Sequence, residues 1–319
     1  MGKALFCRPK MKQITKHILM VRPAAFGFNP ETAADNAFQQ QDASLGVDQI
    51  RAGAQKEFDA FVQQLRDAGV DVLVAQDSDD PMKPDAVFPN NWVSFHANST
   101  VYTYPMYASV RRHERRQSIL DMIEKKFEMQ AVFNLENFED KGIYLEGTGS
   151  IVFDRVNRIA YACLSERTHE VLFEKYCKMA AYRKHLFHAV DAGGRPIYHT
   201  NVMMAMGTSF VVVCMDSVRD EAEKASLRRS FAATEKEVVN ISLDQMNSFA
   251  GNMLQVQGSK GSLLVLSEQA FASLDSHQVN RLERHTELLV ASIPTIEKFG
   301  GGSVRCMMAE VFLPPKHID

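Results

Sequence analysis

Short apolar runs alternate with polar loops along almost the whole chain. The runs HILMVR, DVLVA, SFVVVCM and SLLVLS have the length and the β-branched content of strands. Other stretches show helical spacing: apolar residues fall on one face of residues 54–70 and of residues 119–127, and Gly69 is placed to end the first of these helices. Strands that alternate with amphipathic helices predict an α/β fold.

Five polar residues recur along this pattern, each at the start of an apolar run. They are Asn91, Glu146, His199, Asn252 and Cys306, at intervals of 55, 53, 53 and 54 residues. A fixed period indicates repeated structural units that pack on one another. Equivalent positions in such units lie at equal depth, so these five junction residues are expected to converge on one site.

Each repeat is predicted to contain a strand, a polar loop, a hairpin that begins at the junction residue, and a helix. In the third repeat LFHAV is the first strand, His199 opens the strand VMMAM, SFVVVCM is its hairpin partner, and a helix begins after Asp220. The fifth repeat stops after VRCMMAEVF, and its missing strand and helix are predicted in HILMVRP and residues 54–70. A repeat divided between the two terminal segments closes a ring without open sheet edges.

Units that share one register must pack together, so residues 1–319 are predicted to form a single domain. Residues 1–10 are predicted to be a loose N-terminal extension. Residues 23–50 interrupt the periodicity with Gly, Asn, Pro, Ala and Gln. Long loops inside compact domains often cover a site, so this segment is predicted to be a lid, with a surface excursion as the alternative.

Composition and charge exclude several classes of protein. The chain is 45% hydrophobic and 24% charged, with a net charge of −3 and scattered basic residues, so neither nucleic acid nor an anionic membrane is an expected partner. No run approaches 18 uninterrupted apolar residues, and no signal peptide is expected. Five widely spaced cysteines without a CxxC pair favour a reduced, cytoplasmic protein. The oligomeric state stays open.

Cys306 is the candidate nucleophile. It follows GGGSVR, and three glycines let the backbone wrap closely around a small ligand. The register it shares with His199 and Glu146 joins a thiol to an imidazole and a carboxylate, the set that generates a thiolate, holds its base and orients that base. Three of the other cysteines are predicted to be inert core residues, namely Cys163, Cys177 and Cys214.

Neither a metal nor a cofactor is predicted. His185 and His188 belong to one strand and are expected to face opposite ways, and no other His, Cys or carboxylate cluster has ligand spacing. GTGS at 147–150 is too short for a phosphate loop and lacks the following Lys. Glu146, directly before it, is therefore interpreted as a carboxylate that points into a cavity.

These residues resemble the guanidino-group modifying enzymes, the superfamily of arginine deiminases, dimethylarginine hydrolases and amidinotransferases. The resemblance covers most of the chain through FPNNW, LEGTGS, LSERT, HTN and GGGSVRC, and FGFNP with FPNNW is most similar to the citrulline-utilisation hydrolases. It implies a five-bladed pentein, an α/β propeller of pseudo-fivefold strand-strand-strand-helix repeats. It also implies Cys306 as nucleophile, His199 as acid and base, Glu146 as its partner, and Arg167 as a candidate for the substrate carboxylate.

Two departures from the arginine deiminases bear on the substrate. Where those enzymes grip the guanidinium with two aspartates, this chain has Asn91 and Asn201. Charge-assisted hydrogen bonds contribute about 1.5–3 kcal/mol each, so their loss disfavours arginine, whereas Asn can donate to a ureido oxygen. We therefore expect hydrolysis of a terminal ureido group, citrulline giving ornithine plus carbamate through an S-carbamoyl-cysteine. Asn90 and Asn252 are further candidates for substrate binding, and Arg22 and Arg305 compete with Arg167 for the carboxylate.

Two alternatives remain open at this point. An arginine-type guanidino hydrolase, whether deiminase or dihydrolase, or an amidinotransferase would use the same three catalytic groups. The pentein ring also serves as a binding module without catalysis, in the translation factor that prevents ribosomal subunit joining. The fold alone does not decide between an enzyme and a binding module. A binding module has no need for a thiol, an imidazole and a carboxylate together, so these three residues favour an enzyme.

Overall fold

The computed structural model describes residues 11–33, 36, 38–42 and 44–316, so the predicted extension, residues 1–10, lies outside it. Within this part of the chain the strands form five three-stranded sheets, ordered β15-β1-β2, β3-β4-β5, β6-β7-β8, β9-β10-β11 and β12-β13-β14. The strands are β1 (His17–Arg22), β2 (Asp71–Gln76), β3 (Val93–Phe95), β4 (Thr100–Thr103), β5 (Ala131–Asn134), β6 (Val152–Asp154), β7 (Ile159–Cys163), β8 (Arg183–Phe187), β9 (Met204–Met206), β10 (Phe210–Val213), β11 (Glu237–Asn240), β12 (Leu254–Gln257), β13 (Ser262–Ser267), β14 (Glu287–Ala291) and β15 (Ala309–Glu310).

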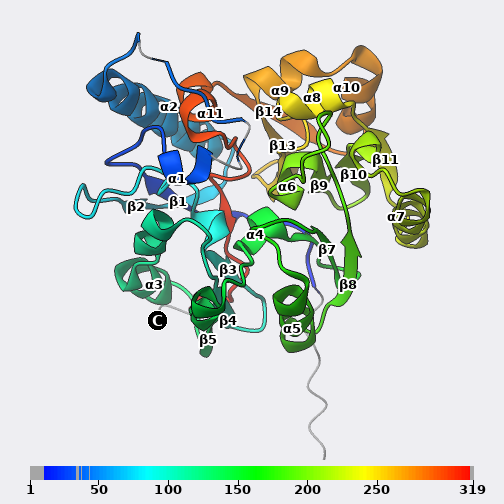
Figure 1. Cartoon of the computed structure of the whole chain (residues 1–319), viewed down its shortest axis with the longest axis horizontal. Helices are drawn as coiled ribbons and strands as arrows, with labels where there is room; N and C mark the ends of the chain where they lie inside the picture. The colour runs from blue at the N-terminus through cyan, green and yellow to red at the C-terminus, as the bar shows by residue number, and fades with distance from the viewer. Residues whose placement is uncertain (1–10, 34–35, 37, 43, 317–319) are drawn as a thin grey trace, which may run out of the picture.

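The longer helices lie outside the sheets (Figure 1). The α-helices are α1 (Pro30–Ala33), α2 (Val47–Asp67), α3 (Gln117–Glu124), α4 (Gly147–Ser150), α5 (Glu170–Ala180), α6 (Thr200–Met203), α7 (Glu221–Ala233), α8 (Leu243–Asn247), α9 (Glu268–Ser273), α10 (Ser276–Glu283) and α11 (Pro294–Gly300). Short 3-10 helices are η1 (Pro89–Asn91), η2 (Ser109–Glu114), η3 (Glu136–Lys141) and η4 (Met215–Ser217). Figure 1 shows the five sheets around a common centre, where α4 and α6 lie.

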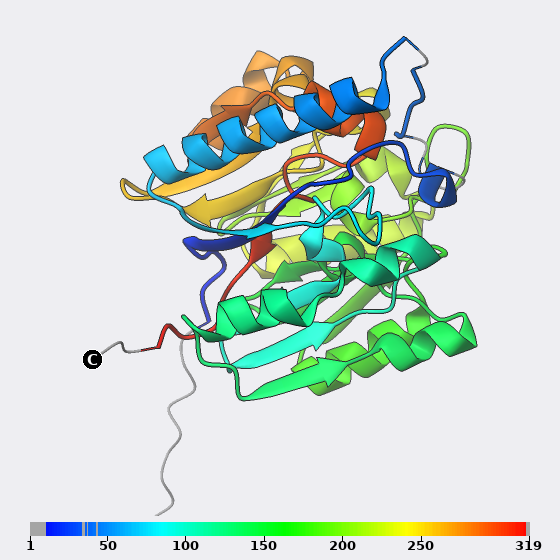
Figure 2. The ribbon, with the colours of Figure 1, turned by 90° about the vertical axis from the view of Figure 1, so that its left-hand side faces the viewer.

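The two terminal segments of the described chain share one sheet. β1 pairs antiparallel with β15, through Ile18 with Glu310 and Leu19 with Ala309, and parallel with β2. Figure 2 shows α2 along the outer face of this sheet, beside α11. Phe58, as predicted, lies on the buried face of α2. The predicted pairing of the N- and C-terminal segments is therefore observed.

The sheets divide the repeats differently from the sequence pattern. The strand before each junction residue completes the preceding sheet: β8 pairs in parallel with β7, although it was predicted to begin the repeat of His199. In four of the sheets, an antiparallel hairpin is followed by helical residues and a third, parallel strand; in the fifth sheet the strand antiparallel to β1 is β15, from the other end of the described chain. A parallel pair needs a crossover through a helix, and a crossover returns the chain to the sheet it left.

Two element boundaries in the structure also differ from those predicted. His199 does not open a strand directly, because the helical turn α6 separates it from β9. α2 begins at Val47 rather than at residue 54, so the irregular segment ends at Gly46, whose amide donates to the side chain of Gln49. Helix starts are set by such local capping contacts, which periodicity does not report.

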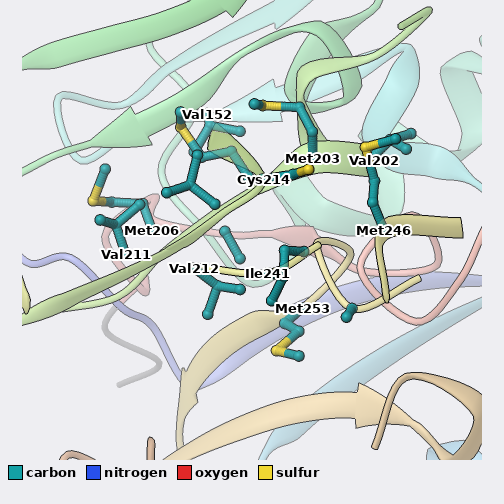
Figure 3. Close-up of a cluster of buried hydrophobic side chains, with 14 of the residues drawn as sticks. Val152, Val202, Met203, Met206, Val211, Val212, Cys214, Ile241, Met246 and Met253 are labelled. Atoms are coloured by element: carbon teal, nitrogen blue, oxygen red, sulfur yellow. The ribbon is translucent and has the colours of Figure 1, made fainter. Parts of the chain in front are cut away.

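A methionine-rich cluster of buried side chains packs around the short helix α6. Figure 3 shows Met203, Met246 and Met253 in one buried cluster with Val202 and Val212. Flexible thioether side chains fill irregular gaps between elements that meet at different angles. The cluster includes Val202 and Met203 of α6, so the helical turn after His199 rests on a close-packed core. No helix among the described residues has both the length and the apolar character needed to cross a membrane.

Candidate active site

The five junction residues all lie buried at the ends of short turns. Asn91 ends η1, Glu146 and His199 directly precede α4 and α6, and Asn252 and Cys306 precede β12 and β15. The turns contact one another, α4 touching both η1 and α6. The shared register of the sequence thus corresponds to one shared region of space.

Glu146 and His199 form a buried, hydrogen-bonded dyad. Glu146 Oε2 lies 2.8 Å from His199 Nε2, and its Oε1 accepts from the backbone amide of Tyr107 at 2.9 Å. Burial acts to raise the carboxyl pKa of Glu146, but the Arg167 charge and the His199 hydrogen bond outweigh it and lower the pKa to about 2. An ionised carboxylate only accepts, so Nε2 carries the imidazole proton.

This arrangement leaves Nδ1 of His199 as the atom available for proton transfer. Burial lowers the pKa of His199 below 6.5, against the opposing effect of Glu146, so the ring is neutral at pH 7. A neutral imidazole with its proton on Nε2 has a bare Nδ1. His199 can therefore accept a proton from a group in the pocket while Glu146 holds the ring.

Two amide side chains contact the sulfur of Cys306. Asn252 Nδ2 lies 3.3 Å and Asn201 Nδ2 3.6 Å from Sγ. The orientation of Asn252 is fixed because its Oδ1 accepts the backbone amide of Arg305 at 3.1 Å. Two N–H groups directed at one sulfur can stabilise a thiolate. Asn201 thus lies against the nucleophile, a contact that the sequence did not predict.

A small cavity joins these groups. It has a volume of about 20 Å³ and is lined by His199, Cys306, Asn91 and Arg167, together with Thr32, Asn36, Asp85, Phe88, Arg111, Tyr198 and Gly300 to Gly302. That volume holds about one water-sized particle. A ligand of amino-acid size therefore needs part of the lining to move.

The roof of this cavity comes from the segment predicted to be a lid. Asn36 Nδ2 donates to Gly301 O at 3.2 Å, Gln39 Nε2 to Phe299 O at 3.1 Å, and Gln40 N to Lys298 O at 2.8 Å. Lys298 Nζ also lies 2.6 Å from Asp42. These contacts fasten the described part of residues 23–50 to α11 and the glycine turn before Cys306. We call them the roof latch.

Glu297 is a buried acid within α11, next to the roof latch. Its Oε1 accepts from Ser303 Oγ at 2.6 Å. Burial raises the pKa of its carboxyl to about 7. Ser303 lies three residues before Cys306, and its backbone oxygen accepts the Cys306 amide at 2.9 Å. Glu297 thus supports the turn that carries the thiol.

We expect Glu297→Gln to reduce the loss of stability at rising pH. The pKa of Glu297 is raised from 4.5 to about 7 in the folded state, so between these pH values the native state binds more protons than the unfolded state. The contribution of Glu297 to the free energy of unfolding is therefore full below pH 4.5 and is lost as pH rises through 7. The full shift corresponds to roughly 3 kcal/mol. Thermal unfolding at pH 5 and pH 8 measures the effect, with exposed Glu128→Gln as control. Identical pH slopes in wild type and Glu297→Gln would contradict this assignment.

Three charged residues of the site escaped the sequence analysis. Asp85 lines the cavity and accepts from Asn29 Nδ2 at 2.7 Å, and burial raises the pKa of its carboxyl. Arg111 lies 3.7 Å from Asp85 and pairs with Glu114 through two hydrogen bonds of 2.8 and 3.0 Å. Arg111 and Glu114 belong to the run RRHERR, which is typical of a solvated surface, whereas Asp85 lies three residues before the motif FPNNW.

The predicted arginines separate into different surroundings. Arg167 lies in the cavity wall, 3.6 Å from Glu146 and over the ring of Tyr198 at 5.0 Å. Arg22 does not line the cavity: it pairs with Asp59 at 2.8 Å on the surface, which corrects its selection as a substrate ligand. Arg305 turns toward Glu310 at 3.0 Å, behind the nucleophile.

The remaining predicted amide, Asn90, is buried without lining the cavity. Its backbone oxygen accepts from Thr148 Oγ1 at 3.2 Å, and neither polar atom of its side chain has a hydrogen-bond partner.

Gly149 explains the tight contact between α4 and the site. A Cβ atom there would lie 2.5 Å from Asn91 Nδ2 and 2.8 Å from His199 Nδ1, closer than real Cβ contacts. Only glycine lets these side chains approach.

The model of the family described as N,N dimethylarginine dimethylhydrolase, eukaryotic, matches residues 22–313. The chain belongs to this family. It is therefore an enzyme of the cysteine-dependent guanidino-hydrolase type, within the guanidino-group modifying superfamily that the sequence motifs resemble. Membership argues against the alternative of a binding module without catalysis. A search of curated protein sequences found no match.

Solved structures of this dimethylarginine hydrolase type and of arginine dihydrolases share the fold. The N-terminal domain of ArgZ, an arginine dihydrolase from the ornithine-ammonia cycle in cyanobacteria bound to product, matches with a TM-score of 0.72 and 15% identity, over 93% of this chain and 98% of that domain. Unliganded AgrE gives 0.70 and 14%, over 94% of this chain and 40% of its own. A dimethylarginine dimethylaminohydrolase variant bound to S-methyl-L-thiocitrulline gives 0.64 and 14%, over 93% and 99%. At such identities the matches establish the fold alone.

Proposed function

We propose that the enzyme hydrolyses the terminal ureido group of citrulline to ornithine and carbamate. The observation that carries this proposal is the absence of an acid at positions 91 and 201, where amides stand beside the thiol, imidazole and carboxylate. A guanidinium would gain charge-assisted bonds from acids there, whereas a neutral ureido group gains nothing from a buried charge and can be held by amides.

In the proposed reaction Cys306 is the nucleophile. Nδ1 of His199 takes the thiol proton, and the thiolate, stabilised by the amides of Asn201 and Asn252, attacks the ureido carbon. The C–N bond to ornithine breaks, and His199 returns the proton to the departing amine. A water molecule deprotonated by the same ring then cleaves the S-carbamoyl-cysteine. This releases carbamate, which decomposes to ammonia and carbon dioxide, and restores the thiolate.

The charged groups of the cavity suit the amino-acid end of such a substrate. Asp85 can pair with an α-ammonium, and Arg167 or Arg111 with an α-carboxylate. Both arginines approach Glu146, at 3.6 and 3.9 Å, so they also lower the pKa of that carboxyl. We assign Asp85 and Arg167 to substrate binding, in place of Arg22.

The same proposal covers architecture and access. We interpret the five sheets as the blades of a pentein, residues 1–319 as one domain, and the described part of residues 23–50 as a lid. Support comes from the sharing of one sheet by β1 and β15 and from a cavity of about 20 Å³ under a hydrogen-bonded roof. A substrate enters when the roof latch opens, and closure of the latch excludes water from the cavity.

An arginine-type hydrolase is the second candidate. Asp85 is a buried acid that lines the cavity, and the buried Glu146 lies 3.6 Å from Arg167 in the cavity wall; a cationic head group could compensate their charge. The family description names dimethylarginine, and ArgZ is named an arginine dihydrolase. These names describe relatives, and this chain can share their substrate only if its amides accept a guanidinium.

Steady-state assays with citrulline, arginine and dimethylarginine distinguish the two candidates. We expect ornithine and ammonia from citrulline, with kcat/KM at least tenfold higher than for arginine, since one lost charge-assisted hydrogen bond corresponds to about a factor of ten. Amino-acid analysis and an ammonia assay measure the products. Citrulline accumulating from arginine would establish a deiminase, and turnover of arginine alone would reject the ureido proposal.

A further inference from the structure

The side-chain amide of Asn91 has a defined orientation. Its Oδ1 lies 3.0 Å from Arg111 Nη1. A guanidinium has only donors, so the atom that faces it must be the amide oxygen. The nitrogen, Nδ2, consequently points the other way, and it has no hydrogen-bond partner although it is buried.

Glu114 holds the guanidinium that sets this orientation. Its two carboxylate oxygens accept from Arg111 Nε and Nη2, at 2.8 and 3.0 Å, and both residues belong to η2. A bidentate pair fixes the plane of the guanidinium as well as its position. With Nε and Nη2 engaged, Nη1 is the group left to meet Asn91. Both side chains are only 1 to 3% exposed, so water competes little for these contacts.

The unpaired nitrogen lies beside the catalytic ring. Asn91 lines the same cavity as His199 and Cys306. A Cβ atom at Gly149 would lie 2.5 Å from Asn91 Nδ2 and 2.8 Å from His199 Nδ1, so the two nitrogens lie close together beside Gly149. A buried donor without an acceptor is costly, and a carbonyl oxygen of a ligand in the cavity would satisfy it.

We propose that Glu114 and Arg111 lock the Asn91 amide with its N–H groups toward the pocket, and that this lock selects a ureido oxygen over a guanidinium. The inference rests on the proposed function and deepens it. A ureido group offers an oxygen acceptor to Asn91 Nδ2, whereas a guanidinium offers only N–H groups, so two donors would face each other. Glu114 is a positioning residue, because it reaches the substrate only through Arg111 and Asn91.

Calorimetric binding to an inactive background tests the lock. In Cys306→Ser protein, L-citrulline should bind more tightly than L-arginine. Adding Glu114→Gln should weaken citrulline roughly tenfold relative to arginine, the effect of one lost hydrogen bond. The matched control is Glu139→Gln, which breaks a similar bidentate pair with Arg115 (2.6 and 3.1 Å) that does not line the cavity.

A second variant keeps the test decisive if Glu114→Gln folds poorly. Asn91→Asp leaves the Glu114–Arg111 pair in place but offers the pocket an acceptor, so the preference should reverse toward arginine. Equal weakening of both ligands by Glu114→Gln would mean that Glu114 only supports a grip on the α-carboxylate, and would overturn the lock. An unchanged preference in Asn91→Asp would overturn it as well. Failure of the Cys306→Ser protein to bind either ligand would instead reject the proposed function.

Discussion

Cys306→Ser is expected to lower kcat for citrulline by roughly 10³-fold or more, because a hydroxyl is a far weaker nucleophile than a thiolate held by two amide donors. The substitution replaces the sulfur with a smaller and less nucleophilic oxygen and leaves the charged side chains of the cavity intact. Citrulline binding should therefore persist while ornithine release stops. Quenched-flow mass spectrometry of the wild type should also show a Cys306 peptide heavier by one carbamoyl group.

Cys177→Ala is the matched control for the nucleophile. Cys177 lies in α5, does not line the cavity, and burial raises the pKa of its thiol to about 12. Its replacement should leave kcat unchanged apart from a small loss of stability. If Cys306→Ser turned over citrulline within tenfold of the wild-type rate, covalent catalysis by this residue would be ruled out, and direct attack by water would replace it.

Glu146→Gln is expected to reduce kcat by about 10³-fold, within the 10²- to 10⁴-fold range of acid-base groups. Gln can donate as well as accept, so it no longer forces the imidazole proton onto Nε2 of His199. It also removes the negative charge that opposes desolvation, so the pKa of His199 should fall further. In the wild type, activity should decline as pH falls through the His199 pKa, below 6.5, and this limb should move to lower pH in the variant.

Profiles of kcat/KM against pH measure both effects for Glu146→Gln. Glu139→Gln provides the comparison, since Glu139 also accepts a backbone amide and pairs with an arginine, outside the cavity. We expect that control to retain the wild-type profile. A loss below tenfold in Glu146→Gln, with the acid limb unmoved, would show that Glu146 orients nothing the reaction needs.

Periodicity in the sequence located the centre of the site because every repeat delivers its junction residue to the same place. Glu146, His199 and Cys306 stand in register for that reason: His199 and Cys306 line one cavity, and Glu146 contacts His199 at 2.8 Å. The same signal could not say which sheet a strand joins. β8 appeared to open a repeat but completes the preceding sheet, since sheet membership depends on the crossover and not on sequence spacing.

The charged residues of the cavity wall could not be predicted from the sequence for a different reason. Arg111 and Glu114 lie in a run of like and unlike charges, and such runs are usually solvated. Only the turn of η2 buries both side chains against Asn91 and Asp85. Arg22, in contrast, ends the buried strand β1, yet it pairs with Asp59 at the surface. Pairing partners distant in sequence decide where a long side chain points.

The sheet shared by β1 and β15 links the position of the nucleophile to contact between two segments that lie far apart in the sequence. β15 begins three residues after Cys306 and pairs with β1, near the opposite end of the described chain. This pairing anchors the segment that places the sulfur beside the side chains of Asn201 and Asn252. A molecule in which β1 and β15 have not paired is therefore expected to turn over substrate more slowly than the fully folded enzyme.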